Sequence, residues 1–540
     1  MDANLICKKL AILEGDRSNI ERVWELIKKY VANYRNDYYT DATTEGGVDW
    51  TARHLFDSTA QVSSQILAYS IHGALTNQST QWFDFRFRDQ ELSKDTAAVQ
   101  WLKRCAKIVY DALQDSNFNI EILEAYLDLV GPGITFLSQE FDETATKTES
   151  VFAALPTQEC YFNEDHNGQV YEFFRKRLWT PTAIKSKFGD KTPQSIVEMC
   201  DAGKTERQEV VFCVFRRDKY SAQVPAAPNM RPFGGKYVLV KTKEQLGDEL
   251  GYYEMPVYVA RWGRSPNSKW GYSPSFIAMP DILTLNQLVE LILRATEKAV
   301  DPATLATERG LLSDLDLSAG GLTMVRDIEG VRPFESRARF DVSELQREKL
   351  ISSIRQVYMV DQLQLKDSPA MTATETQVRY ELMQRLLGPT AARIKRDLLD
   401  PLVERTFRAL WRSNRLPAPP DAIKGSAAEL DILYTGPLDR AQKVDAAAAT
   451  ERWLMGISNA AQFDAQALDL VDIDAVVRGQ ASDLDVPADY IRNNDRVVAI
   501  RKQRQQQMAQ QQQLMDAQAA GSAMEAVGKG AAALGSKGNA

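Results

Sequence analysis

The chain has 540 residues, of which 44% are hydrophobic and 26% charged, as in globular proteins with a sizeable core and unlike disordered or fibrous chains. Its 65 basic and 73 acidic residues give a formal net charge of −8. Proteins that grip nucleic acid through its phosphates usually carry a clustered basic excess, so any contact with DNA is expected to be local and weak.

The first hundred residues have helical periodicity. Ser18 and Glu21 have the spacing of a capping box, which predicts a helix beginning there. Apolar residues behind them recur every three or four positions, giving one apolar face. Two further helices are expected over residues 57–75 and 99–113.

From about residue 134 to residue 280 the pattern changes to that of β-strands. Short segments rich in aromatic and β-branched residues are bounded by Gly, Pro and Asn. These segments are 170–178, 210–216, 236–240 and 256–262. They predict a small β-rich unit between helical blocks.

A helix–insert–helix pattern follows. Apolar periodicity predicts a helix over 280–300, which ends before Pro302 because the residue before a proline disfavours α-helical geometry. About forty glycine-containing residues come next. A second helix is then expected to start at Asp341 or Ser343, where Ser343 and Gln346 again have capping-box spacing. Two long helices around a small module predict a stalk that carries a tip.

The helical pattern breaks over residues 361–369 and restarts with a capping box at Thr372. That helix is expected to end at Gly388, and another to cover 390–411 with a kink at Pro401. Residues beyond the following prolines predict short helices on an acidic background, and the last forty residues are Gln-, Ala- and Gly-rich. The acidic background includes Asp464, Asp469, Asp472, Asp474, Asp483, Asp485 and Asp489.

Nothing at the start of the sequence predicts a secretory signal, because no basic head leads into an apolar run. The longest stretch without charged side chains, 58–83, is too polar for a bilayer core, so we expect a soluble protein. The cysteines form no CxxC pair and predict reduced thiols packed as small hydrophobic groups. The three histidines share no metal-binding spacing with them, so no zinc site is expected.

A search for catalytic motifs finds none. Gly203-Lys204-Thr205 lacks the first glycine of a phosphate-binding loop, since Glu198 stands at that position, and Tyr237 replaces the hydroxyl residue after Gly234-Gly235-Lys236. The aspartate run has neither the glycine nor the terminal glutamate of a calcium loop. Pairs of carboxylates leave metal-assisted chemistry open, but no spacing selects a pair. We therefore expect a protein that assembles rather than catalyses, with no cofactor.

A set of motifs resembles the portal proteins of short-tailed bacteriophages, which connect the head to the tail. The motifs occur in the same order as in that family over about residues 20–500. They are RHLFDSTA (53–60), LT (75–76), WF (82–83), RW (261–262), GYSP (271–274), LTLN (283–286), MTATE (371–375) with Arg379, LGP (387–389), LL (398–399), PL (401–402) with Arg405, and YTGPL (434–438) with RAQ (440–442).

The resemblance implies a mixed α+β fold, mainly α-helical, with the wing, stem, clip and crown of a phage portal. The implied boundaries are wing 1–279 with a small β-barrel-like unit, first stem helix 280–300, clip 301–340, second stem helix 341–360, tunnel loop 361–372, connecting helices 373–412, crown 413–500 and a low-complexity tail 501–540.

The family implies a ring, typically of twelve subunits, at one capsid vertex of the virion, built from chains synthesised in the host cytoplasm. Double-stranded DNA would pass through the ring during packaging and ejection without sequence recognition, along an acidic or mixed channel wall. The implied partners are other copies of the chain, capsid and scaffolding proteins, the terminase packaging motor and a tail adaptor, with no membrane.

Two sites follow from the resemblance. A DNA-facing tunnel loop would include Asp361, Gln362, Lys366, Asp367, Ser368 and Pro369. An adaptor-docking clip would include Arg309, Asp314, Asp316, Arg326 and Arg332. Two alternatives are a soluble, metal-dependent DNA-processing enzyme encoded by a phage, and another structural virion protein such as a coat or scaffold.

Overall fold

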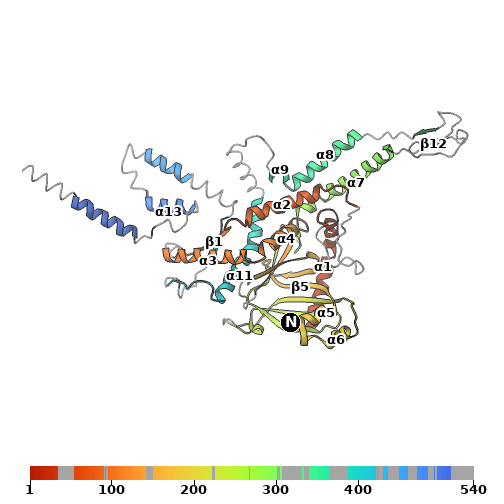
Figure 1. Cartoon of the computed structure of the whole chain (residues 1–540), viewed down its shortest axis with the longest axis horizontal. Helices are drawn as coiled ribbons and strands as arrows, with labels where there is room; N and C mark the ends of the chain where they lie inside the picture. Colours follow the sequence, from red (N-terminus) through yellow and green to blue (C-terminus); the bar gives the residue numbers. More distant parts are fainter. Residues whose placement is uncertain are drawn as a thin grey trace, which may run out of the picture. The chain divides into compact units, whose positions relative to one another are not determined.

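The computed structural model describes residues 1–33, 54–89, 92, 95–141, 150–221, 226–266, 268–300, 304–306, 331–333, 340–363, 387–420, 423, 430–435, 449–459, 471–483, 492 and 496–511 (Figure 1). The chain divides into two compact units. Unit 1 comprises Met1–Asp84, Cys105–Pro417 and Tyr434–Leu438, and unit 2 comprises Phe85–Arg104, Ala418–Leu433 and Asp439–Ala540. The described residues mix helices with strands and are mainly helical, which confirms the expected fold class.

Unit 1 contains most of the described helices. They are α1 (Ala3–Tyr30), α2 (Thr59–Leu75), the part of α3 (Thr96–Gln114) that begins at Cys105, α4 (Phe118–Val130), α5 (Pro181–Phe188), α6 (Gln194–Asp201), α7 (Pro274–Val300), α8 (Phe340–Val357), α9 (Val360–Leu363), the π-helical segment η6 (Lys395–Leu399) and α11 (Asp400–Arg412). The prediction of helices over 57–75 and 99–113 is confirmed to within a few residues.

The start of α1 differs from the expectation. The helix begins at Ala3, where the Asp2 carboxylate caps the first turn by accepting from the backbone N–H of Ala3 at 2.8 Å. Ser18 lies inside the helix, and its hydroxyl donates to the carbonyl oxygen of Gly15. The capping-box spacing at Ser18 was misleading because a serine can bond back to the preceding turn within a helix.

Two antiparallel sheets occupy the middle of unit 1. The three-stranded sheet has the order β3-β2-β9, and the five-stranded sheet has the order β4-β5-β6-β7-β8. The strands are β2 (Ile134–Phe141), β3 (Ser150–Leu155), β4 (Cys160–Glu164), β5 (Val170–Trp179), β6 (Gln208–Arg216), β7 (Phe233–Leu239), β8 (Gln245–Tyr252) and β9 (Val257–Arg261). Among these strands the expected barrel-like unit is an open meander with β4 and β8 at its edges.

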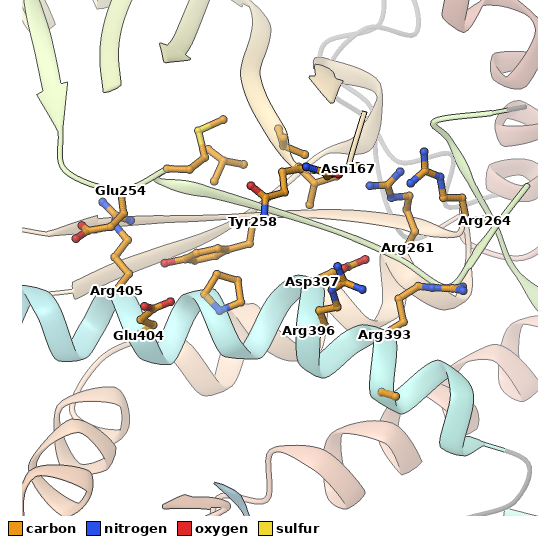
Figure 2. Close-up of a pocket in the computed structure, with 18 of the residues that line it drawn as sticks. Asn167, Glu254, Tyr258, Arg261, Arg264, Arg393, Arg396, Asp397, Glu404 and Arg405 are labelled. Atoms are coloured by element: carbon orange, nitrogen blue, oxygen red, sulfur yellow. The ribbon is translucent and has the colours of Figure 1, made fainter. Parts of the chain in front are cut away.

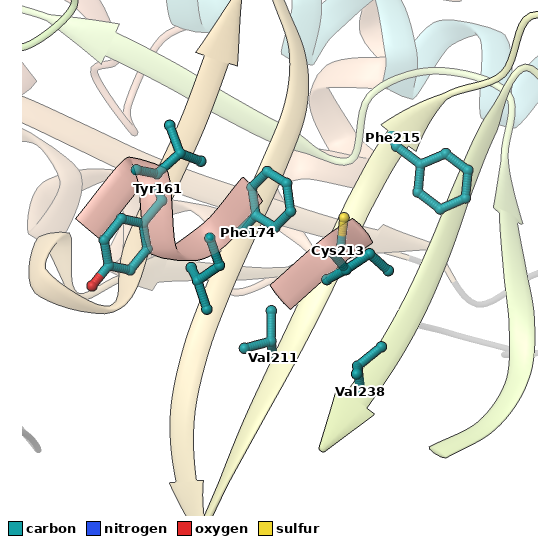
Figure 3. Packing of buried hydrophobic residues seen from close by; sticks show 9 residues of the cluster. Tyr161, Phe174, Val211, Cys213, Phe215 and Val238 are labelled. Carbon is teal, nitrogen blue, oxygen red and sulfur yellow. The ribbon is translucent and has the colours of Figure 1, made fainter. Parts of the chain in front are cut away.

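The five-stranded sheet is covered on both faces. Its strands alternate side chains between the faces, so Val211 and Val210 point in opposite directions. Val211 belongs to a buried cluster that packs against α1, and Val210 belongs to a second cluster that packs against α5 and α6. Figure 3 shows the first cluster, with Phe174, Cys213 and Val238 directed from the sheet towards the ribbon of α1.

The helices α7 and α8 pack against each other and lead to a small ladder of β12 (Thr304–Ala306) and β13 (Val331–Pro333), as Figure 1 shows. The expected stalk with a tip is therefore present. α7 begins at Pro274, six residues before the expected start at Pro280, which lies inside the helix. α8 begins at Phe340, so Ser343 does not cap it.

Within the described residues, α7 is the one helix whose length and apolar composition would suffice to cross a membrane. Its most apolar 18-residue window has a mean hydropathy of 1.5 and is 28% buried in the single chain. Core helices of water-soluble proteins share these properties.

A long helical run continues from Leu387, the first residue of its described segment, through Pro389 to Arg412. The helix expected to start at Thr390 thus already includes Pro389. The irregularity expected at Pro401 lies immediately before it, as the π-helical turn η6. Proline has no N–H to donate to the carbonyl four residues earlier, which favours an irregular turn at this place.

Unit 2 holds a two-stranded sheet of β1 (Phe83–Phe87) and β14 (Leu430–Tyr434), whose first and last residues fall in unit 1. Its helices are the first part of α3, residues 449–459, α13 (Ile473–Asp483) and residues 496–511. Arg501 pairs with both carboxylate oxygens of Asp474 at 2.6 and 2.7 Å.

Candidate functional site

A chain of buried hydroxyl groups fixes the base of the two long helices in unit 1. The Tyr358 hydroxyl donates to Ser275 Oγ at 2.8 Å, and Ser275 Oγ donates to the carbonyl oxygen of Val130 at 2.8 Å. All three residues are buried, so each bond is made away from water. These two hydrogen bonds join the end of α8 to the start of α7 and to α4.

A second anchor connects two of the motifs that the sequence analysis quoted. The side chain of Asn286, in α7, donates to the carbonyl oxygen of His54 and accepts from the N–H of Phe56, both at 2.8 Å. Asn286 is 8% exposed. The side-chain amide of Asn286 therefore satisfies one backbone carbonyl and one backbone N–H, and it holds residues 54–56 against α7.

The tip of the stalk is defined by a short antiparallel ladder. Thr304 pairs with Pro333, and Leu305 pairs with Arg332. Three residues separate α7 from this ladder, and six separate it from α8. The ladder brings the two ends of the intervening segment together where the helices finish.

The C-terminal end of α8, away from the β12–β13 ladder, is followed by a change in backbone conformation. Met359 has a φ of 58°, in the left-handed region that side chains with a Cβ rarely adopt. Asp361 follows in the four-residue helix α9, and its Oδ1 accepts from Arg355 Nη2 at 2.8 Å. The break in the helix is thus held by an ion pair across it.

A groove of about 630 Å³ lies between the strand β9 and the helical run that contains η6 (Figure 2). Arginines occur on both sides of it. From the strand side come Arg261 and Arg264, and from the helix side come Arg393, Arg396, Arg405 and Arg408. Its carboxylates are Glu254, Asp397 and Glu404.

One end of this groove has an excess of positive charge. Glu164 bonds both Arg261, at 2.8 Å, and Arg264. Arg393 donates to the carbonyl oxygen of Trp262 at 2.9 Å, a bond that neutralises no charge. Arg396 is exposed and makes no hydrogen bond or ion pair with the residues that the structure describes.

Asp397 lies among these four arginines. Burial raises the pKa of its carboxyl group above the ordinary value, although the surrounding guanidinium groups act to lower it. Ionised Asp397 is therefore poorly solvated, and the neighbouring positive charges only partly compensate for its burial.

At the other end of the groove, the charged side chains bond to groups of the chain itself. Arg405 donates to the carbonyl oxygen of Gln139, and Arg408 pairs with Glu404 four residues earlier. Glu254 accepts two bonds from Arg412, at 2.6 and 2.9 Å. Arg405 and Arg412 thus bond the helix to residues outside it, and Arg408 is paired within the helix, so little charge is left for a ligand.

In the part of the chain that the structure describes, no group of three or more His, Cys, Asp and Glu side chains is arranged to hold a metal ion. The chemistry that the structure offers is that of charged and apolar contact surfaces.

A family model described as "Bacteriophage head to tail connecting protein" matches residues 3–491. The chain belongs to this family. It is 23% identical to the "Probable portal protein" of Bordetella phage BPP-1 over 532 residues, which cover 95% of this chain and 94% of the relative. It is 22% identical to the "Portal protein" of Salmonella phage epsilon15 over 533 residues, which cover 95% and 93%.

Two solved structures also align with the chain. One is a chain of the virion of a native gene transfer agent particle, with 11% identity, a TM-score of 0.36 and coverage of 79% of this chain and 88% of that one. The other is a chain of the neck of such a particle, with 11% identity, a TM-score of 0.34 and coverage of 73% and 86%.

Family membership identifies the chain as a structural portal protein, a part of the phage head-to-tail connection, and the enzyme alternative is not favoured. Of the expected tunnel-loop residues, Asp361 and Gln362 lie in α9 at the break after α8. The other members lie outside the described residues: Lys366, Asp367, Ser368 and Pro369. Of the expected clip residues, Arg332 is in β13, and the rest lie outside the described residues: Arg309, Asp314, Asp316 and Arg326.

The structure adds residues that sequence reasoning did not single out. Asn286 belongs to a quoted motif, but its contact with His54 spans 232 positions and needed the fold. The arginine groove joins residues about 130 positions apart, since Arg393 bonds Trp262. A possible signal was the density of arginines just before Pro401.

Proposed function

We propose that twelve copies of this chain form a closed ring at one vertex of the capsid, through which double-stranded DNA enters during packaging and leaves during ejection. The ring would be bound by capsid and scaffolding proteins, then by the terminase motor, and finally by a tail adaptor at the clip. Subunits would be made in the host cytoplasm and then incorporated into the virion. The role is structural, and no enzymatic activity is required of it.

The observation that carries the proposal is the helical stalk with its tip, in a chain of the head-to-tail connecting family. The outer half of α7 exposes apolar side chains on more than one side, among them Leu291 at 55%, Leu293 at 52% and Val300 at 81%. Large apolar side chains exposed together on one helix usually mark a contact surface, here alongside charged residues such as Glu290 and Arg294. Neighbouring copies in a ring would cover this helix, because head-to-tail contacts whose rotation closes generate rings.

The net charge of the chain supports a channel that binds DNA weakly and lets it move through. A channel that neutralised many phosphates would bind DNA tightly through counterion release. A net charge of −8 per chain leaves no general basic excess for such binding.

In this proposal the tunnel loop is residues 361–372 and the clip is residues 301–340, the boundaries that the resemblance implies.

The test is the assembly state of the purified full chain at micromolar concentration and moderate salt. Native mass spectrometry should show a closed oligomer with a mass of twelve chains, and negative-stain images should show rings with a central hole. Monomers with magnesium-dependent DNA cleavage would support the enzyme alternative, and shells or rods would indicate a coat or scaffold.

A further inference from the structure

The arginine end of the groove has room and charge for a ligand that the described residues do not provide. Four guanidinium groups, from Arg261, Arg264, Arg393 and Arg396, surround Asp397 and meet one further carboxylate, that of Glu164. Arg396 is exposed, and no described residue pairs with it. The local excess of positive charge therefore lines the groove, whose arginines are drawn in Figure 2.

The chemistry of this end favours a carboxylate as the ligand. A guanidinium group presents parallel N–H donors that match the two oxygens of a carboxylate. A DNA duplex is a poorer fit for two reasons. The groove volume of about 630 Å³ suits a few side chains, and Glu254, Asp397 and Glu404 along its length would repel a continuous run of phosphates.

An acidic segment with this chemistry is present in the same chain. Residues 461–490 contain seven aspartates and a single basic residue, Arg478. In unit 2, part of this segment forms α13, and Asp474 there is already paired with Arg501. The remaining aspartates outnumber the one arginine, so the segment complements the groove in charge.

We propose that the arginine groove binds aspartate side chains from residues 461–490 of a neighbouring copy of this chain. The inference rests on the proposed ring, in which the groove would meet an adjacent copy. It assigns the groove to the contact between subunits and gives the acidic segment a partner. Each contact would exchange water for charge-assisted hydrogen bonds and would weaken with salt.

The experiment uses the variant Arg396→Lys, which keeps the positive charge and introduces an amine. Rings are assembled from an equal mixture of ¹⁴N- and ¹⁵N-labelled full-length chains and treated with a carbodiimide, which joins an amine directly to a carboxylate in contact with it. Mass spectrometry should find residue 396 joined to an aspartate of 461–490 in peptide pairs of mixed isotope composition. Arg22→Lys, at an exposed position of α1, is the matched control and should give no such product.

Charge reversal provides a second readout. Arg396→Glu should lower the salt concentration at which rings dissociate, and Arg22→Glu should not. Three cross-linking results would each overturn the inference. In the first, every cross-linked peptide pair carries a single isotope. In the second, residue 396 is joined to acids outside 461–490, and in the third, intact rings give no product at residue 396. The inference would also be overturned if Arg396→Glu rings dissociated at the same salt concentration as the parent rings but retained less DNA. That result would mean that the groove binds nucleic acid. Failure of the parent chain to form rings at all would instead contradict the proposed function.

Discussion

The side-chain amide of Asn286 donates to the backbone carbonyl of His54 at 2.8 Å, while its oxygen accepts from Phe56. A single side chain on α7 thus satisfies two backbone groups of a segment that precedes it by 232 positions. No aliphatic or acidic side chain of similar size can do both, because one bond needs a donor and the other an acceptor.

Asn286→Ala should therefore destabilise the chain by about 1 kcal/mol, since it leaves two partly buried backbone groups without this partner. Asn286→Asp should be at least as harmful, because a carboxylate cannot donate to His54. Denaturant unfolding measures both. Thr284→Ala, an exposed change near Asn286, is the control and should alter stability by no more than about 0.5 kcal/mol. Equal effects of the Asn286 and Thr284 changes would contradict this role.

Deleting residues 305–335 should remove the tip and leave soluble subunits that still assemble but fail to recruit tail components. The deletion takes out β13 and all but Thr304 of β12. The helices α7 and α8 would remain because their buried contacts lie at the opposite end, at Ser275 and Tyr358. Tail attachment in an assembly extract is the measurement. A deletion of similar length in the tail, 512–540, is the control, and normal tail attachment without the tip would refute the clip assignment.

Replacing Lys366 and Asp367 by alanine should leave rings intact and change the packaging or retention of DNA. The proposed tunnel loop, 361–372, follows the backbone break at Met359, and the change preserves net charge. Genome content of filled heads measures the effect. The double change Lys185→Ala and Asp201→Ala, which removes an exposed ion pair of the wing, is the charge-matched control. Normal packaging and stable full heads in the tunnel-loop variant would show that the loop is an ordinary connection.

A thiol reagent at pH 8 should modify Cys7 and Cys200 first and the three buried cysteines only after unfolding. Burial raises the pKa of Cys105 to about 12 and also raises the pKa of Cys160 and Cys213, so their thiols stay protonated and unreactive. Colourimetric titration should count two fast thiols in the native chain and five in guanidinium chloride. Rapid reaction of more than two would contradict the packing shown here.

Asp397→Asn should raise stability slightly at pH 7. The pKa of Asp397 is raised in the folded chain, so the folded state holds the proton more tightly than the unfolded state does. Stability that depends on Asp397 therefore falls as the pH rises above about 4, and the asparagine variant escapes this loss. Thermal unfolding between pH 4.5 and 7.5 should show a gap that narrows towards acid. A gap that widens towards acid would mean that the arginines outweigh burial.

The sequence was sufficient for elements whose own periodicity decides them. The strands at 170–178 and 210–216 and the helix at 57–75 lie where expected, because their apolar residues repeat with the period of the structure. Helix starts were less predictable. Ser18 and Ser343 have capping spacing but lie within helices, because α1 already begins at Ala3 and α8 at Phe340.

The candidate sites depended on contacts that no local pattern contains. Asp361 and Gln362, expected at the start of a loop, lie in the short helix α9, which follows the break at Met359. The pairing of Arg261 with Glu164, and of Arg393 with Trp262, joins separate strands and helices. Such contacts are set by the fold, so single-residue spacing could not reveal the groove.

The π-helical turn at Lys395–Leu399 makes the helical run one residue longer per turn at this place. Each residue of an α-helix advances the side chains by about 100° around the axis. The turn takes up its extra residue without extra rotation, so deleting one codon within it would restore regular winding and leave Arg393 and Leu402 in nearly their present relative orientation. Inserting one codon there would instead rotate Arg393 by about 100° away from the groove while Leu402 stayed packed. A portal subunit should therefore tolerate the loss of one residue at this turn better than the gain of one.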